Sequence, residues 1–308
     1  MRKLDGIGRR WWARRTPCLV SPRSVLALAI ASVHVFASTW AKEPATLATR
    51  ERREHFVEHV ALALAVDSRL TGKARRDQVK QRLWMLIDHE LDQVGLPAIP
   101  GRRYRVWFDV AEAAPLGASF NYRDWQIILD KKLVDQARRP EKAVELGELL
   151  YHELRHVEQH YLLGRWLVAQ GRVREIYRVL PRFFAEAARY DALPAGPLAK
   201  TVARWYAQFT PENQATLEAF TSACNAVRSA VKRREKLAKR LAEARARKRD
   251  GGLRQQLERE FKGARFEEGL ARQGYRKLLP RYKHLPFEAD AYKVAGRLRT
   301  LLARRLAE

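Results

Sequence analysis

Apolar residues recur at intervals of three and four along most of this chain, which is the spacing of an amphipathic helix. The pattern predicts two helices within residues 49–94, separated at Thr71-Gly72. It also predicts a long helix at 141–169, because Pro140 suits the start of a helix and Gly171 suits its end. The other predicted helices cover residues 174–190, 197–208, 211–230, 231–262 (two charged helices, broken at 250–252) and 287–306.

Two short segments, 104–110 and 125–129, are rich in aromatic and β-branched residues and are predicted to be strands. Many helices with a small sheet predict a mainly α member of the α+β class. In this interpretation, residues 45–98 form a helical N-terminal region. The strands and the long helix belong to a second region at 99–308.

The segment 1–41 has the layout of a secretory signal peptide. Residues 2–23 hold seven basic side chains and a single acid, Asp5, and an apolar run follows at 25–37. Small residues then lead to Ala41, so the segment predicts export to the periplasm or out of the cell. The apolar run is shorter than the roughly 18–20 residues of a membrane-spanning helix. The alternative is an uncleaved leader that associates the protein with a membrane.

Composition and charge narrow the possible classes of protein. Hydrophobic residues make up 46% of the 308 residues, which excludes a disordered chain, and two cysteines cannot form a disulfide framework. The formal net charge is +25, and residues 228–283 hold twenty Lys and Arg against seven acids. We predict an inserted charged helical hairpin at about 228–262. It could bind an anionic surface or stay solvated, whereas nucleic acid is disfavoured because 231–260 offers no aromatic residue for base stacking.

The long predicted helix contains His152-Glu153-Leu154-Arg155-His156, which is an HExxH motif. On a helix, residues four apart lie about 40° from one another, so both imidazoles can point at one metal ion. Glu153 lies about 100° round, where its carboxylate can take a proton from a water on that metal. The pattern indicates a Zn²⁺ site with His152 and His156 as ligands and Glu153 as general base. The alternative is a pair of core histidines on an amphipathic helix, with an exposed glutamate between them.

A catalytic zinc site needs a third protein ligand. The extended HExxHxxGxxH pattern fails, since Gln159 stands at its glycine and Leu162 at its third histidine. His160 is predicted to lie about 80° from His152, too far round the helix for the same ion. Glu288 is the better candidate, because it falls in the first turn of the last predicted helix, on a core face where a carboxylate needs a partner. The alternative is that Glu288 only complements the helix dipole.

Several other polar residues have two interpretations. Arg155 is predicted either to hold the long helix against a buried carboxylate or to be solvated. His55, His59 and His89 come close to the motif without completing it, and they are predicted to be helix-surface histidines. Four residues near Glu288 in the sequence could stabilise an oxyanion, with nothing to choose among them: Tyr275, Tyr282, His284 and Tyr292.

The segments HELRHVEQ and LPFEADA, far apart in the sequence, together resemble a known family. Zincin-like metallopeptidase domains of bacterial secreted and polymorphic toxins carry HExRHxxQ and a later Leu-Pro-x-Glu-x-Asp-Ala segment. The resemblance covers about residues 100–305. It implies a gluzincin-type site with these members: His152 and His156 as ligands, Glu153 as base, Glu288 as third ligand, and Asp290 as an acidic partner that orients a ligand histidine.

This chain departs from the family in two places. The charged hairpin lengthens the interval before Glu288, and Phe287 stands where an acid is frequent. Asp290 also presents a geometric difficulty, because residues two apart do not face each other on a regular helix. It could orient a ligand histidine only from an irregular first turn.

The sequence thus predicts a zinc-dependent metallopeptidase with a zincin-like domain at 99–308. Its substrate would be a peptide or protein, hydrolysed by metal-activated water with Glu153 as general base. The alternative is an exported basic protein that binds an anionic surface or nucleic acid and carries an incidental HExxH. Metal content separates the two predictions.

Overall fold

The long predicted helix is present as α5, which covers Pro140–Ala169. Pro140 occupies its first turn, and Gly171 follows its end with a φ of 70°, a conformation that glycine adopts without strain. The computed structural model describes residues 46–67, 69–99, 104–111, 117–247 and 251–307. The predicted signal peptide at 1–41 lies outside these described residues.

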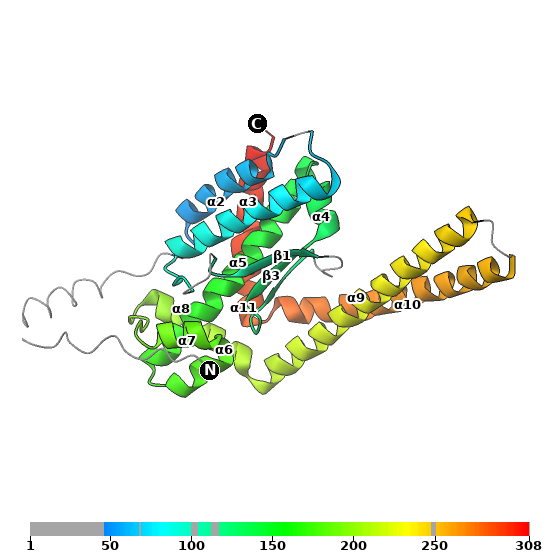
Figure 1. Ribbon diagram of the computed structural model, residues 1–308. Coiled ribbons are helices and arrows are strands. Elements are labelled where there is room, and N and C mark those ends of the chain that lie inside the picture. Colours follow the sequence, from blue (N-terminus) through cyan, green and yellow to red (C-terminus); the bar gives the residue numbers. More distant parts are fainter. Residues whose placement is uncertain (1–45, 68, 100–103, 112–116, 248–250, 308) are drawn as a thin grey trace, which may run out of the picture. The chain divides into compact units, whose positions relative to one another are not determined.

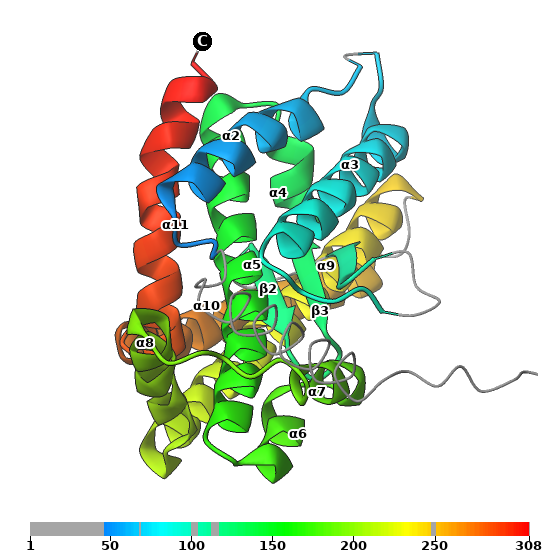
Figure 2. The same ribbon diagram turned by 90° about the vertical axis from the view of Figure 1, so that its left-hand side faces the viewer.

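Three of the helices that pack on α5 come from the two ends of the sequence. α2 (Arg50–Leu64) and α3 (Gly72–Gln93) come before it, and α11 (Pro286–Arg305) returns to lie beside it (Figure 1). α5 and α11 approach closely at Gly147, where a Cβ atom would lie 2.8 Å from Leu302 Cδ1. Figure 2 shows α11 on one side of α5 and the sheet on the other. The last long helix is thereby placed against the helix that carries HExxH.

A three-stranded sheet covers another side of α5. The strands are β1 (Trp107–Ala111), β2 (Ala118–Asn121) and β3 (Gln126–Asp130), in the order β1-β3-β2. β1 runs parallel to β3, and β2 runs antiparallel to it, so β2 is an edge strand; it also contacts α5. The mainly α, α+β class is confirmed. The sequence predicted β1 and β3, with β1 beginning too early, and it did not predict β2.

The single helix predicted at 174–190 is wrong, since this segment folds as two short helices around Pro181. α6 (Ile176–Val179) ends where Leu180 is extended, and α7 (Arg182–Ala188) begins after Pro181. A residue before proline favours extended backbone, and proline has no N–H to continue a helix. The remaining short elements are α4 (Lys131–Gln136), the 3₁₀ turn η1 (Val173–Glu175), α8 (Pro197–Trp205) and the 3₁₀ turn η2 (Tyr206–Phe209).

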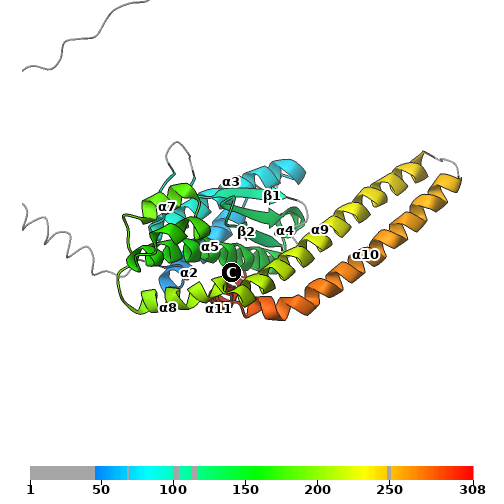
Figure 3. The same cartoon turned by 90° about the horizontal axis from the view of Figure 1, so that it is seen from below.

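The charged segment forms a hairpin of two long helices, α9 (Pro211–Ala246) and α10 (Gly251–Lys283), which lie side by side (Figure 3). α9 is continuous through residues 230–231, where the sequence predicted a boundary between helices. A small hydrophobic cluster, separate from the main core, holds the pair together: Leu237, Leu241, Ala244, Leu257 and Ala264. Because α9 begins at Pro211 and α10 ends at Lys283, the hairpin extends beyond the predicted range of 228–262 at both ends.

Contacts divide the chain into Met1–Lys42 and Glu43–Glu308, and only the second unit contains described residues. The main hydrophobic core of this unit includes residues from Leu47 to Leu302, drawn from α2, α3, the sheet, α5 and α11. The helical region predicted at 45–98 therefore shares its core with the region at 99–308. Within the described residues, no helix combines the length and the apolar character needed to cross a membrane.

Candidate metal centre

The HExxH motif lies near the middle of α5, where the helix is buried. His152 and His156 are 6% and 7% exposed, and their Nε2 atoms lie 3.1 Å apart. The two rings stand nearly perpendicular, at 87°. Residues four apart on a helix lie on the same face, which is why both imidazoles reach one point.

Glu288 reaches the same point from the first turn of α11. Its Oε2 atom lies 3.1 Å from His152 Nε2, and its Oε1 atom lies 3.1 Å from His156 Nε2. One donor atom from each residue lies within 4.8 Å of the others, so His152, His156 and Glu288 form a buried group that could hold a metal ion. In the parts of the chain that the structure describes, this is the one group of three or more such residues.

The chemistry of these donors fits a divalent cation. Two imidazoles and one carboxylate are a ligand set that catalytic zinc sites use. Burial lowers the pKa of His156, but the charge of Glu288 and its hydrogen bond outweigh burial and raise this pKa to about 9. Burial also raises the pKa of Glu288, while the charge of His156 and hydrogen bonds from both rings hold it well below its usual range. A proton on His156 thus balances the negative charge of the Glu288 carboxylate. A metal ion bound by the two residues would balance that charge in its place.

A glutamine fixes the orientation of the His156 ring. Gln159 Oε1 accepts a hydrogen bond from His156 Nδ1 at 2.8 Å, which leaves Nε2 facing the candidate ligand group. The Gln159 amide donates in turn to the Phe287 carbonyl at 3.0 Å and to Asp290 at 2.9 Å. Asp290, expected to orient a ligand histidine directly, contacts Gln159 instead, and α11 needs no irregular turn for this. The sequence signal for Gln159 is its place three residues after His156, on the same face of the helix.

Two tyrosines complete the surroundings of the group. The Tyr282 hydroxyl donates to Glu288 Oε1, and its ring stacks on Phe220 of α9 with centroids 3.7 Å apart. The Tyr292 ring packs against His152 at 4.5 Å. Of the other two oxyanion candidates, Tyr275 packs against Phe220, and His284 is exposed. The sequence alone does not mark Phe220, because its role depends on how the base of the hairpin meets α11.

Glu153, the predicted general base, is buried beside the two histidines. Glu153 is only 6% exposed. It is therefore not the exposed glutamate that the alternative, a pair of core histidines without a metal, would have between them. Burial raises the pKa of Glu153, although the charges of His152 and His156 and a backbone hydrogen bond from Phe120 oppose this rise. Phe120 belongs to the edge strand β2. The edge of the sheet therefore lies close to the carboxylate.

Besides His284, four histidines of the described residues lie outside the group: His55, His59, His89 and His160. His160 Nδ1 donates to the Val179 carbonyl at 3.0 Å, and burial lowers the pKa of this histidine to about 3. His55 and His59, predicted at a helix surface, are half-buried, while His89 is exposed. Their rings stack, with centroids 4.0 Å apart for His55 and His59 and 5.1 Å apart for His55 and His89. The surface prediction for His55 and His59 is therefore only partly right.

Arg155 anchors α5 from inside the protein. The residue is 2% exposed, its Nε donates to Asp290 at 2.7 Å, and its Nη1 donates to Glu158. Glu158 is also buried and accepts the backbone N–H of Leu47 at 3.0 Å. The guanidinium lies over the Trp205 ring, 4.9 Å from its centroid. Of the two interpretations of Arg155, the buried anchor is the one the structure supports.

We expect Arg155→Met to lower the free energy of unfolding by roughly 3–5 kcal/mol, because it leaves Glu158 buried without its cation. Arg299→Met is the matched control: Arg299 has a side chain 64% exposed and pairs with Glu148 at the surface. Its loss is expected to cost at most about 1 kcal/mol. Urea unfolding followed by circular dichroism measures both variants. Equal losses would show that Arg155 contributes no more than a surface arginine.

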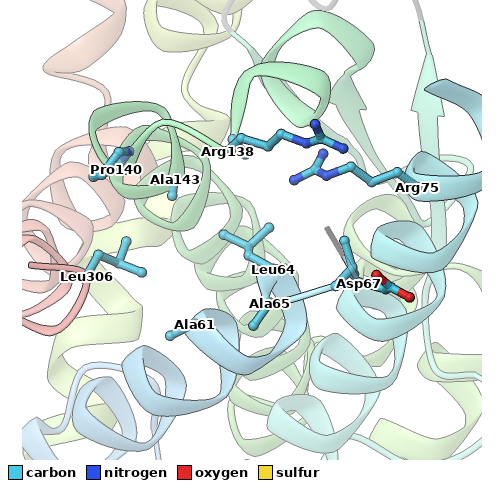
Figure 4. Close-up of a pocket in the computed structure, with 11 residues that line it drawn as sticks. Ala61, Leu64, Ala65, Asp67, Arg75, Arg138, Pro140, Ala143 and Leu306 are labelled. Atoms are coloured by element: carbon cyan, nitrogen blue, oxygen red, sulfur yellow. The ribbon is translucent and has the colours of Figure 1, made fainter. Parts of the chain in front are cut away.

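A cavity at the start of α5 lies apart from the candidate metal centre. Its volume is about 360 Å³, and Figure 4 shows it lined mostly by apolar side chains, with Leu306 on one side. Arg75 and Arg138 reach its rim, where Arg75 donates to the Val134 carbonyl at 3.0 Å and Arg138 donates to the Leu70 carbonyl. None of the candidate metal ligands lines this cavity.

Comparisons with protein-family models, with curated proteins and with solved structures find no match to this chain. The function is therefore inferred from the chain's own residues. The observations that bear on it are the buried histidine and glutamate donors, the neighbouring Glu153, and the edge strand beside them.

Proposed function

We propose that this chain is a zinc-dependent metallopeptidase of the gluzincin type, with a zincin-like core made of α5, the sheet and α11. The observation that carries the proposal is the buried group of His152, His156 and Glu288. Two histidines of an HExxH helix and a glutamate from a later helix suit a zinc site that keeps one position open. With the predicted signal peptide at 1–41, we propose that the enzyme acts outside the cytoplasm.

When bound by these three residues, Zn²⁺ would supply a Lewis acid that polarises a peptide carbonyl and lowers the pKa of water. Glu153 acts as general base: it takes the proton of the attacking water and then delivers it to the leaving amine. Its burial beside the histidines supports this role, and its raised pKa makes it a better proton acceptor. Gln159 keeps His156 Nε2 directed at the ligand position.

The edge strand β2 is the proposed binding site for substrate. Its neighbour in the described sheet is β3, and no strand of the described residues pairs with its other edge. An extended peptide can add to such an edge as a further strand through main-chain hydrogen bonds. Because Phe120 of β2 lies against Glu153, a peptide held there would pass close to the base.

Metal analysis of the purified full-length chain tests the proposal. We expect about one zinc per chain, and hydrolysis of an unstructured protein such as casein that a chelator stops and added zinc restores. The alternative, a basic binding protein with an incidental HExxH, predicts no stoichiometric metal and no hydrolysis. Folded protein that takes up no zinc would overturn the proposal.

A further inference from the structure

Helix α10 has an exposed face that α9 does not cover. Leu257, Ala264 and Glu268 of α10 are buried against α9. Exposed residues follow one another at intervals of three and four on the other side, so they share one face of the helix. We call this face the outer stripe, and its members are Arg259, Lys262, Phe266, Leu270, Gln273 and Lys277.

Two large apolar side chains lie in the middle of the outer stripe. Phe266 is 68% exposed and Leu270 is 53% exposed. Because they lie one turn apart, they form one apolar patch rather than two scattered side chains. Neither belongs to the hydrophobic cluster that joins α9 and α10. The packing of the hairpin therefore does not explain them.

Unbalanced positive charge surrounds this patch. Residues 228–283 carry twenty Lys and Arg against seven acids. Arginines of α9 pair with three glutamates of α10, which are Glu258, Glu267 and Glu268. By contrast, Arg259, Lys262 and Lys277 of the outer stripe have no ion pair within the described parts of the chain. Lys262 still acts electrostatically on Glu258, one turn away, but none of the three cations forms a close ion pair there, so each can attract an anionic partner.

We propose that the outer stripe of α10 docks on the surface of an anionic phospholipid bilayer, a function separate from the proposed peptidase activity. The cations are attracted to the anionic head groups. Phe266 and Leu270 enter the boundary between head groups and acyl chains, where the apolar face of an interfacial helix lies. An apolar pair flanked along the helix by Arg259 and Lys277 matches that surface in both charge and polarity.

Nucleic acid carries the same negative charge but offers a poorer partner for the apolar pair. Single strands are bound by stacking bases on aromatic side chains, and Phe266 is the one aromatic residue of the outer stripe. Leu270 gains little from stacking, whereas it gains by leaving water for the acyl boundary. The pair therefore favours lipid as the partner.

Co-sedimentation of the full chain with vesicles tests the proposal. We expect binding to mixed phosphatidylglycerol and phosphatidylcholine vesicles, none to pure phosphatidylcholine, and weaker binding as salt rises. Arg259→Glu combined with Lys277→Glu is expected to weaken binding at least about 20-fold. Phe266→Ser combined with Leu270→Ser is expected to weaken it about 10-fold or more.

Two controls make changes of the same kind away from the hairpin: a double charge reversal and one apolar-to-serine substitution. Arg297→Glu combined with Arg304→Glu alters exposed residues of α11, and Leu62→Ser removes a side chain that is 58% exposed on α2. Both are expected to keep binding within about 2-fold of wild type. Equal losses in controls and stripe variants would overturn the proposal, as would equal binding to neutral vesicles or tighter binding to a single-stranded oligonucleotide at the same salt. If a stripe variant unfolds, the wild-type preference for anionic vesicles decides.

Discussion

Replacing Glu288 with alanine is expected to leave the purified protein without bound zinc and without peptidase activity. Two imidazoles would remain at the site, whereas a catalytic zinc ion is held by three protein ligands. The loss of affinity should exceed the roughly 10–100-fold cost of changing residues that only support metal ligands. Metal analysis after dialysis and a titration against a zinc-binding dye measure it.

Two further variants show whether the effect belongs to the carboxylate. Glu288→Gln keeps the shape of the side chain and an oxygen for the Tyr282 hydroxyl, but it lacks the charge, so it too is expected to lose zinc. His160→Ala removes a buried imidazole that bonds to the Val179 carbonyl, outside the candidate ligand group, and zinc content is expected to stay near wild type. If Glu288→Ala kept its zinc while His160→Ala lost it, the assignment of Glu288 as the third ligand would be wrong.

Replacing Glu153 with glutamine is expected to abolish hydrolysis while zinc content stays near wild type. An amide cannot accept the proton of the attacking water, and a general base contributes roughly 10²–10⁴-fold to the rate. The substitution preserves the shape of the side chain and an oxygen for the backbone of Phe120, so the fold is expected to hold. Peptide cleavage rates and metal analysis on the same preparation measure the two effects separately.

Glu90→Gln provides a matched control for Glu153→Gln. Glu90 is also a fully buried carboxylate beside a histidine, with its Oε1 atom 2.5 Å from His55 Nδ1, but it lies in α3, outside the candidate ligand group. This variant is expected to retain activity if it folds. Full activity in Glu153→Gln would remove Glu153 from the reaction, and loss of zinc from that variant would make Glu153 a ligand instead.

Local sequence signals predicted the two helices that carry the candidate ligands. Pro140 and Pro286 lie in the first turns of α5 and α11, and the predicted starts differ from the observed ones by a single residue. The repeat of apolar residues along α11 was enough to place Glu288 on its core face. Such features depend on near neighbours in the sequence, which is why a single sequence can reveal them.

Contacts between distant elements could not be predicted in the same way. Gln159 supports His156 only because α11 docks and supplies Asp290 and the Phe287 carbonyl as acceptors. The strand β2 is four residues long and includes two polar ones, so its conformation depends on pairing with β3. The contact between the Tyr282 hydroxyl and Glu288 likewise depends on how the base of the hairpin meets α11.

The candidate ligands are made at very different times during synthesis. His152 and Glu288 lie 136 residues apart, and the whole hairpin is translated between them. A growing chain therefore carries both histidines and the base long before it carries the third donor. Three-ligand metal binding would have to wait until α11 is made and packs on α5 at Gly147. If the chain is the proposed peptidase, this order would keep it inactive until α11 has been made, which would spare the nascent chain and its neighbours from cleavage.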